Sequence, residues 1–268
     1  MDQKRKNKRK RLLRLAALGT CLGLLGAGIS GCGVGNGAKR QELRLQAIEQ
    51  MDSGDYSGAI SVLDEALDLG KGSVGAFEID ILQYRAEAEF RAEDYAAAAH
   101  TYDVLLQVDE ERPEYIRLRC ISSIRSGDVD AALEDFQNLY SQTGEEDPEA
   151  MGQLAADVGM ALESAGRTQE ALEIYSQAQA DGLANSIIYN RIGLCRMAKE
   201  AYIQAEAAFA AGLECPDKTV EADLMFNRAV ALEYQGEYQQ ALAAFEEYTA
   251  RFGQDDKAQH EIDFLRTR

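Results

Sequence analysis

The side chains best suited to nucleophilic or metal chemistry in this chain are five cysteines and two histidines. His100 and His260 lie in different predicted helices, without the spacing that paired metal ligands require. The 268-residue sequence contains no H-E-x-x-H, G-x-S-x-G or EF-hand pattern. We therefore predict no catalytic residue, no metal site and no cofactor, and we expect a protein that is not an enzyme.

The sequence GKGSVG at residues 70–75 has the glycine spacing of a dinucleotide-binding loop. Such a loop follows a β-strand and opens a helix, whose N-terminus binds the pyrophosphate. Here the preceding segment, SVLDEALDL, has the pattern of a helix. The glycines therefore predict a connection between two helices, and we expect no bound nucleotide.

Cys32 differs from the other cysteines because it follows a basic segment and a short apolar run. Residues 1–14 carry eight Lys or Arg and one Asp, and residues 15–29 are largely apolar with four glycines. An apolar run of 15 residues is shorter than the roughly 20 that cross a bilayer as a helix. This order of segments is typical of a secretory signal peptide.

The end of that segment, Ile29, Ser30, Gly31 and Cys32, resembles a bacterial lipobox. The resemblance implies that residues 1–31 are a lipoprotein signal peptide and that Cys32 becomes the acylated mature N-terminus. Two acyl chains give stable membrane attachment, whereas one gives only marginal binding. We expect a lipid anchor at the cell membrane, on its extracytoplasmic face. The alternatives are an ordinary signal peptide with a chance cysteine and an uncleaved anchor.

The charge of the chain restricts its partners. Removal of residues 1–31 leaves 20 basic and 45 acidic side chains, so the net charge changes from −18 to about −25. Such a surface repels phosphate groups, and we therefore expect no nucleic acid partner. Cys120, Cys195 and Cys215 remain, and their odd number and irregular spacing do not indicate a disulfide framework.

A repeated pattern fills the rest of the chain and must position its other residues. Anchor alanines recur at intervals of 39, 34, 39, 34 and 36 residues: Ala59, Ala98, Ala132, Ala171, Ala205 and Ala241. Twelve positions before each anchor stands a small residue: Ala47, Ala86, Cys120, Gly159, Gly193 and Ala229. Four positions after each anchor stands a large one: Leu63, Tyr102, Phe136, Tyr175, Phe209 and Phe245. We expect the small residues where two helices approach closely and the large ones between hairpins.

This pattern resembles the tetratricopeptide repeat (TPR) family, whose unit is a helix-turn-helix of about 34 residues. YNRIGLCR from Tyr189 and AEAAF from Ala205 carry the resemblance best, although the chain contains no tryptophan. The resemblance implies an all-α, right-handed superhelical solenoid of about six hairpins over residues 40–255. Residues 32–39 are then a flexible linker behind the anchor, and residues 256–268 are a capping helix.

The same resemblance implies a protein-binding scaffold at the bacterial cell envelope that holds a peptide or helical segment in a concave groove. Residues eleven and eight positions before the anchors are expected to line this groove. The apolar ones are Ile48, Met51, Phe90, Ile121, Ile124, Met160, Leu194, Met197 and Val230. The alternative function is a structural subunit of an envelope assembly complex. A polysaccharide-binding accessory protein ranks third, because most aromatic side chains occupy the packing positions.

Overall fold

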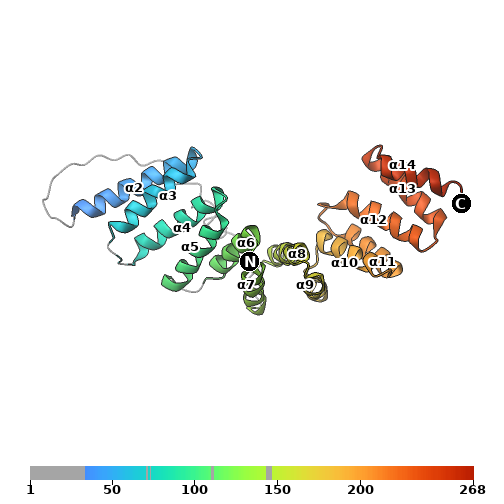
Figure 1. The fold of residues 1–268 in the computed structure, drawn as a ribbon, viewed down its shortest axis with the longest axis horizontal. Coiled ribbons are helices and arrows are strands. Elements are labelled where there is room, and N and C mark those ends of the chain that lie inside the picture. Colours follow the sequence, from blue (N-terminus) through green and yellow to red (C-terminus); the bar gives the residue numbers. More distant parts are fainter. Residues whose placement is uncertain (1–33, 71, 73, 110–111, 143–146) are drawn as a thin grey trace, which may run out of the picture. The chain divides into compact units, whose positions relative to one another are not determined.

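The computed structural model of this chain describes residues 34–268 apart from residues 71, 73, 110–111 and 143–146 (Figure 1). This part of the chain forms thirteen α-helices and no β-strand, which confirms the predicted all-α class. The first six helices are α2 (Val34–Asp52), α3 (Tyr56–Asp68), α4 (Ala76–Arg91), α5 (Tyr95–Val108), α6 (Pro113–Ser126) and α7 (Val129–Ser141). The others are α8 (Pro148–Ser164), α9 (Thr168–Ala180), α10 (Ser186–Ala198), α11 (Tyr202–Glu214), α12 (Glu221–Tyr234), α13 (Tyr238–Phe252) and α14 (Asp256–Leu265).

Residues 40–268 form a compact unit, which begins where the repeats are predicted to begin. Helix α2 starts at Val34, so residues 34–39 are helical where we expected a flexible linker. The helix can extend this far because no proline interrupts it before Arg40. Cys32 and the predicted signal peptide lie outside the described residues.

Helices that follow one another in the sequence pack against each other throughout residues 40–268 (Figure 1). Six hairpins result: α2/α3, α4/α5, α6/α7, α8/α9, α10/α11 and α12/α13. All six anchor alanines are fully buried, with 0% of their surface exposed. Because an alanine side chain is a single methyl group, the two helices of each hairpin can approach closely at this position.

The turn inside each hairpin requires a left-handed residue five positions before the anchor. Gly54 and Gly127 have φ of +83° and +84°, which glycine adopts without steric cost. Glu93 and Glu200 occupy the same position with φ of +62° and +56°. The next residue caps the second helix in the first three hairpins, where Asp55, Asp94 and Asp128 accept a backbone N–H three residues later.

Small residues twelve positions before the anchors lie against large buried side chains. A Cβ atom at Gly159 would lie 2.1 Å from Cε1 of Tyr175, so only glycine fits against that ring. In the third hairpin Cys120 is 0% exposed, and its Sγ donates to the Ala132 carbonyl at 3.3 Å. Burial raises the pKa of this thiol to about 12. Cys120 is therefore an inert packing residue, as predicted.

Helix α14 closes the last hairpin. Its buried residues, Ala258, Ile262 and Leu265, are those that the sequence pattern places on one face. They form a single apolar cluster with Ala229, Leu232, Ala241 and Phe245 of α12 and α13. Helix α14 thus covers apolar surface that a further repeat would otherwise cover.

Candidate partner-binding surface on the first helices

The residues predicted to bind a partner lie on the first helices of the hairpins: α2, α4, α6, α8, α10 and α12. The side chains that stand eleven positions before each anchor alanine reach the surface, and we call this surface the first-helix face. Leu194 is 37% exposed. Ile48, Ile121, Met160 and Val230 are partly buried at the equivalent position.

The residues eight positions before the anchor differ in exposure: Phe90, Ile124 and Met197 are partly buried, and Met51 is buried. Met51 is only 8% exposed and belongs to the core of the first hairpin with Ala59 and Leu63. The Phe90 ring packs edge-on against Tyr95, with ring centroids 5.1 Å apart. In these two hairpins the side chain at this position contacts the second helix of its own hairpin. Met51 is therefore a core residue and does not face a groove, contrary to our expectation.

A cleft between α6 and α8 brings three of the predicted residues together. Ile121 and Ile124 from α6 and Met160 from α8 line an open cleft of about 580 Å³. Val129, Ala161 and Ala165 add apolar surface, and Arg125, Asp157, Ser164 and Gly127 complete the lining. We call this the α6–α8 cleft. The lining combines apolar side chains with one acidic and one basic side chain, which suits an amphipathic segment.

Asp157 is the carboxylate that faces this cleft. Burial raises its pKa, while the hydrogen bond from Gln153 and the charge of Arg125 oppose that shift. The Gln153 amide donates to Asp157 Oδ1 at 2.9 Å. Arg125, seven positions before its anchor, lines the same cleft from α6. A partner can therefore meet one acidic and one basic group beside apolar side chains.

Polar contacts join successive first helices and hold the first-helix face in place. Arg44 of α2 binds Asp80 of α4 and donates to the Tyr84 hydroxyl at 3.3 Å. Asn227 of α12 donates to Asn190 Oδ1 of α10 at 3.0 Å. Arg191 of α10 donates to Glu163 Oε2 of α8 at 3.3 Å. Because each contact crosses from one hairpin to the next, the surface is preformed rather than assembled by a ligand.

Sequence reasoning missed Asp157, Arg125 and Ser164 as lining residues. They stand fourteen or seven positions before their anchors, which is three or four residues from the position of Ile121 and Met160. Residues three and four apart share one face of a helix. That periodicity was the available signal, and it places these positions on the first-helix face.

Among the described residues, no group of three or more His, Cys, Asp or Glu side chains is placed to hold a metal ion. His100 and His260 are both exposed and lie on α5 and α14. No helix in the same residues has the length and apolar character needed to cross a bilayer.

Comparisons with known proteins agree with this architecture. Residues 44–115 match the tetratricopeptide repeat family. Small glutamine-rich tetratricopeptide repeat-containing protein 2 of Mycosarcoma maydis is 30% identical over 108 residues, which are 40% of this chain. The matched segment spans only 29% of that protein.

Solved structures extend the likeness to most of the chain. The apo form of RapI superimposes with a TM-score of 0.64 at 15% identity, over 98% of this chain and 76% of that one. YrrB, described as a TPR protein with an unusual peptide-binding site, has a TM-score of 0.52 at 18% identity, over 74% of this chain and 96% of that one. At these identities the likeness concerns the fold, and the fold is that of TPR repeat proteins.

Proposed function

We propose that this chain is a lipid-anchored scaffold at the bacterial cell envelope that binds a peptide or helical segment of a protein partner on its first-helix face. The observation that carries the proposal is the α6–α8 cleft, where Ile121, Ile124 and Met160 come together. Met160 stands 39 positions after Ile121 and 36 after Ile124, so only the repeat architecture brings these residues together.

The chemistry of the cleft favours a segment with an apolar side. Isoleucine and methionine side chains gain stability when a partner removes them from water. Met160 can adapt to irregular shapes because its side chain is unbranched. Asp157 and Arg125 then orient the segment through its polar groups. A peptide-binding TPR protein, YrrB, is among the proteins of similar fold.

The membrane part of the proposal rests on Cys32 and the segment before it. Because the part after residue 31 has a net charge of about −25, anionic headgroups repel it and the lipid must supply the attachment. We expect Cys32→Ala to leave an unacylated precursor that separates from membranes. Mass spectrometry of the N-terminus measures this, and a mature form that begins at any other residue would contradict the anchor.

Substitutions on the first-helix face test the binding function. Ile121→Asp, Met160→Asp and Leu194→Asp, made singly, place a charge where an apolar partner would lie. Gln137→Asp introduces the same charge at an exposed position on α7, outside the cleft, and serves as the matched control. We measure partner capture from membranes of the expressing cells together with the unfolding temperature.

Capture is expected to fall for the first three variants and to stay unchanged for Gln137→Asp, while all four unfold near the temperature of the native chain. A sharp drop in unfolding temperature for all three would instead show that these side chains are core residues. Recovery of one stable stoichiometric complex would favour the alternative function, a structural subunit of an envelope assembly complex.

A further inference from the structure

An arginine thirteen positions before the anchor recurs in three hairpins, as Arg85, Arg119 and Arg228. In the third hairpin Arg119 uses all three nitrogens of its guanidinium group. Nε and Nη2 donate to Asp135 at 3.0 and 2.7 Å, and Nη1 donates to Asp103 at 2.6 Å. Asp103 belongs to the preceding hairpin and Asp135 to the same hairpin. The arginine therefore joins two hairpins and also neutralises a buried acid.

Arg85 makes the same kind of arrangement in the second hairpin. Its Nε donates to Asp64 of the preceding hairpin at 2.8 Å. Its Nη1 donates to Thr101 at 2.6 Å and forms an ion pair with Glu89. Thr101 and Asp135 both stand three positions after their anchors. This position therefore supplies the partner from the arginine's own hairpin.

Arg228 in the last hairpin lacks that partner. Its Nε donates to Glu206 of the preceding hairpin at 2.7 Å. Ala244 stands three positions after the anchor, where a side chain cannot accept a hydrogen bond. Among the described residues, Glu206 is the only hydrogen-bond partner of the Arg228 guanidinium group. Two of its nitrogens, Nη1 and Nη2, are left with their donor capacity unused by the protein.

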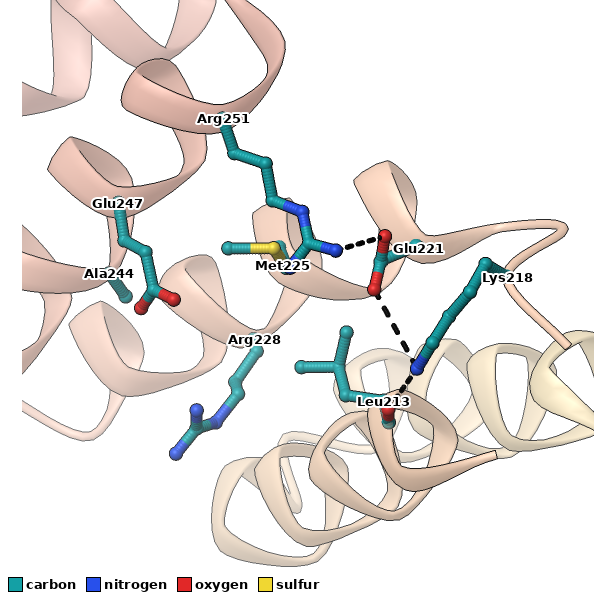
Figure 2. A pocket seen from close by; sticks show the side chains of 8 residues that line it. All are labelled: Leu213, Lys218, Glu221, Met225, Arg228, Ala244, Glu247 and Arg251. Atoms are coloured by element: carbon teal, nitrogen blue, oxygen red, sulfur yellow. Dashed lines mark hydrogen bonds and ion pairs between the residues drawn. The ribbon is translucent and has the colours of Figure 1, made fainter. Parts of the chain in front are cut away.

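A pocket of about 310 Å³ lies beside Arg228 and Ala244 (Figure 2). Leu213, Met225 and Ala244 give it an apolar lining, and Met225 is only 7% exposed. Three cations, Lys218, Arg228 and Arg251, and two carboxylates, Glu221 and Glu247, complete the lining. The pocket is thus locally cationic in a chain whose net charge is −18.

The charges in this pocket are not equally available. Glu221 is shared, because Arg251 donates to its Oε2 at 2.7 Å and Lys218 Nζ lies 3.6 Å from its Oε1. Lys218 also donates to the Leu213 carbonyl at 2.7 Å. In Figure 2 this group lies on the right, and Arg228, Ala244 and Glu247 lie on the left. Glu247 is an exposed side chain on the rim. Arg228 is therefore the cation best placed to accept a new anionic partner.

We propose that this pocket binds the side-chain carboxylate of an Asp or Glu on a protein partner. In the third hairpin the carboxylate of Asp135 fills the equivalent place and forms a bidentate pair with Arg119. In the last hairpin the partner supplies the carboxylate that Ala244 does not. The apolar lining covers the methylene groups of the incoming side chain. This site lies in the last hairpin and does not depend on the α6–α8 cleft.

Methionine methyl groups report on the two sites separately. Met225 lines this pocket and Met160 lines the α6–α8 cleft, so ¹³C-methyl methionine NMR of the full chain distinguishes them. The probe is the peptide Leu-Glu-Leu, acetylated at its N-terminus and amidated at its C-terminus. Leu-Gln-Leu with the same blocked ends removes only the charge. Leu-Gln-Leu with a free C-terminal carboxylate tests whether the pocket binds a chain terminus instead of a side-chain carboxylate.

The Met225 methyl signal is expected to shift saturably with the Glu peptide and to respond much less to the blocked Gln peptide. Arg228→Gln should weaken the affinity about tenfold, the effect of losing a hydrogen bond to a charged group. Ala244→Asp should do the same, because the new carboxylate in the same hairpin competes with the peptide for Nη1 and Nη2 of Arg228, while Nε stays bound to Glu206. Glu247→Gln should strengthen binding. Lys257→Gln, an exposed cation on α14, is the matched control and should change nothing.

Three results would overturn the proposal: no Met225 shift in the native chain, an equal shift with both blocked peptides, or an unchanged affinity in Arg228→Gln and Ala244→Asp. A stronger response to the free C-terminal carboxylate would reject a side-chain ligand. Ala244→Asp retains the arginine and its contact with Glu206, so it tests the pocket even if Arg228→Gln unfolds the last hairpin. A failure here leaves Met160 and the α6–α8 cleft unaffected, so it is distinguishable from a failure of the proposed function.

Discussion

Gly193 is the position at which the close approach of two helices can be tested most simply. It lies inside α10, and a Cβ atom there would be 2.3 Å from Cε1 of Phe209 and 2.6 Å from its Cδ1 and Cζ. Ordinary carbon contacts are about 3.5–4.0 Å. Gly193→Ala therefore forces the Phe209 ring or the helix to move by about 1 Å.

Two opposing contributions determine how much Gly193→Ala changes the free energy of unfolding. Replacing a glycine by alanine inside a helix stabilises it by about 1 kcal/mol. Overpacking a core costs about 1–3 kcal/mol. Phe209 is 0% exposed and packs with Ala205, Leu224 and Ala231, so the ring has no free space to enter. The clash should therefore cost the upper part of that range, about 2–3 kcal/mol. After the gain in helix propensity, we expect Gly193→Ala to lower the free energy of unfolding by about 1–2 kcal/mol.

Urea unfolding followed by circular dichroism measures this change, and a double-mutant cycle assigns its cause. Phe209→Leu provides space for the new methyl group. The double variant should therefore lose less stability than the two single variants lose together, by about 1 kcal/mol or more. Ala207→Gly at an exposed position of α11 measures the helix propensity alone. If Gly193→Ala stabilised the chain by the amount that this control predicts, the close approach of α10 and α11 would be refuted.

Three further predictions follow from charges and caps. Arg119→Met should destabilise the chain by about 2–3 kcal/mol in urea unfolding, because the buried Asp135 would lose its partner. Only 3% of the Asp135 side chain is exposed. Arg266→Met removes a surface ion pair and should cost less than about 0.5 kcal/mol in the same experiment. Asp157→Asn should raise the unfolding temperature at pH 7 but not below about pH 4. Burial raises the pKa of Asp157, so the native protein loses stability as the pH rises through that pKa, and the neutral Asn avoids this loss. An equal change in unfolding temperature at both pH values would reject this cause. Asp94→Ala and Asp128→Ala should each cost about 1 kcal/mol through loss of the helix cap, and urea midpoints equal to that of the native chain would contradict the cap.

The repeat positions were predictable from the sequence because each has one steric requirement that recurs six times. The anchor alanines are all buried, and even the two hairpins with Glu93 or Glu200 at the turn adopt the left-handed conformation that glycine marks elsewhere. Which face of each first helix is exposed was less predictable from the sequence. Residues eight and fourteen positions before the anchors both mix apolar and charged types, as Met51, Glu163, Leu118 and Asp157 show, so hydrophobicity could not decide which faces outward.

The ion pairs of Arg85 and Arg119 were not predictable for a different reason. Arg119 pairs with acids on α5 and α7, and Arg85 pairs with Asp64 on α3 and with Glu89 on its own helix. Only some hairpins have such partners. Val158 and Ile192 occupy the arginine position in the fourth and fifth hairpins, so this position shows no pattern. The pocket beside Arg228 depends on the absence of a partner at Ala244. Such an absence becomes visible only when the hairpins are compared in three dimensions.

Site-specific photocrosslinking in intact cells tests most directly whether a partner segment lies in the α6–α8 cleft. A photoreactive amino acid replaces Met160 in one variant and Gln137 in the other, and mass spectrometry identifies the crosslinked peptides. We expect position 160 to crosslink to one defined segment of an envelope protein and position 137 not to do so. Equal crosslinking at both positions, or no intermolecular product at position 160, would contradict it.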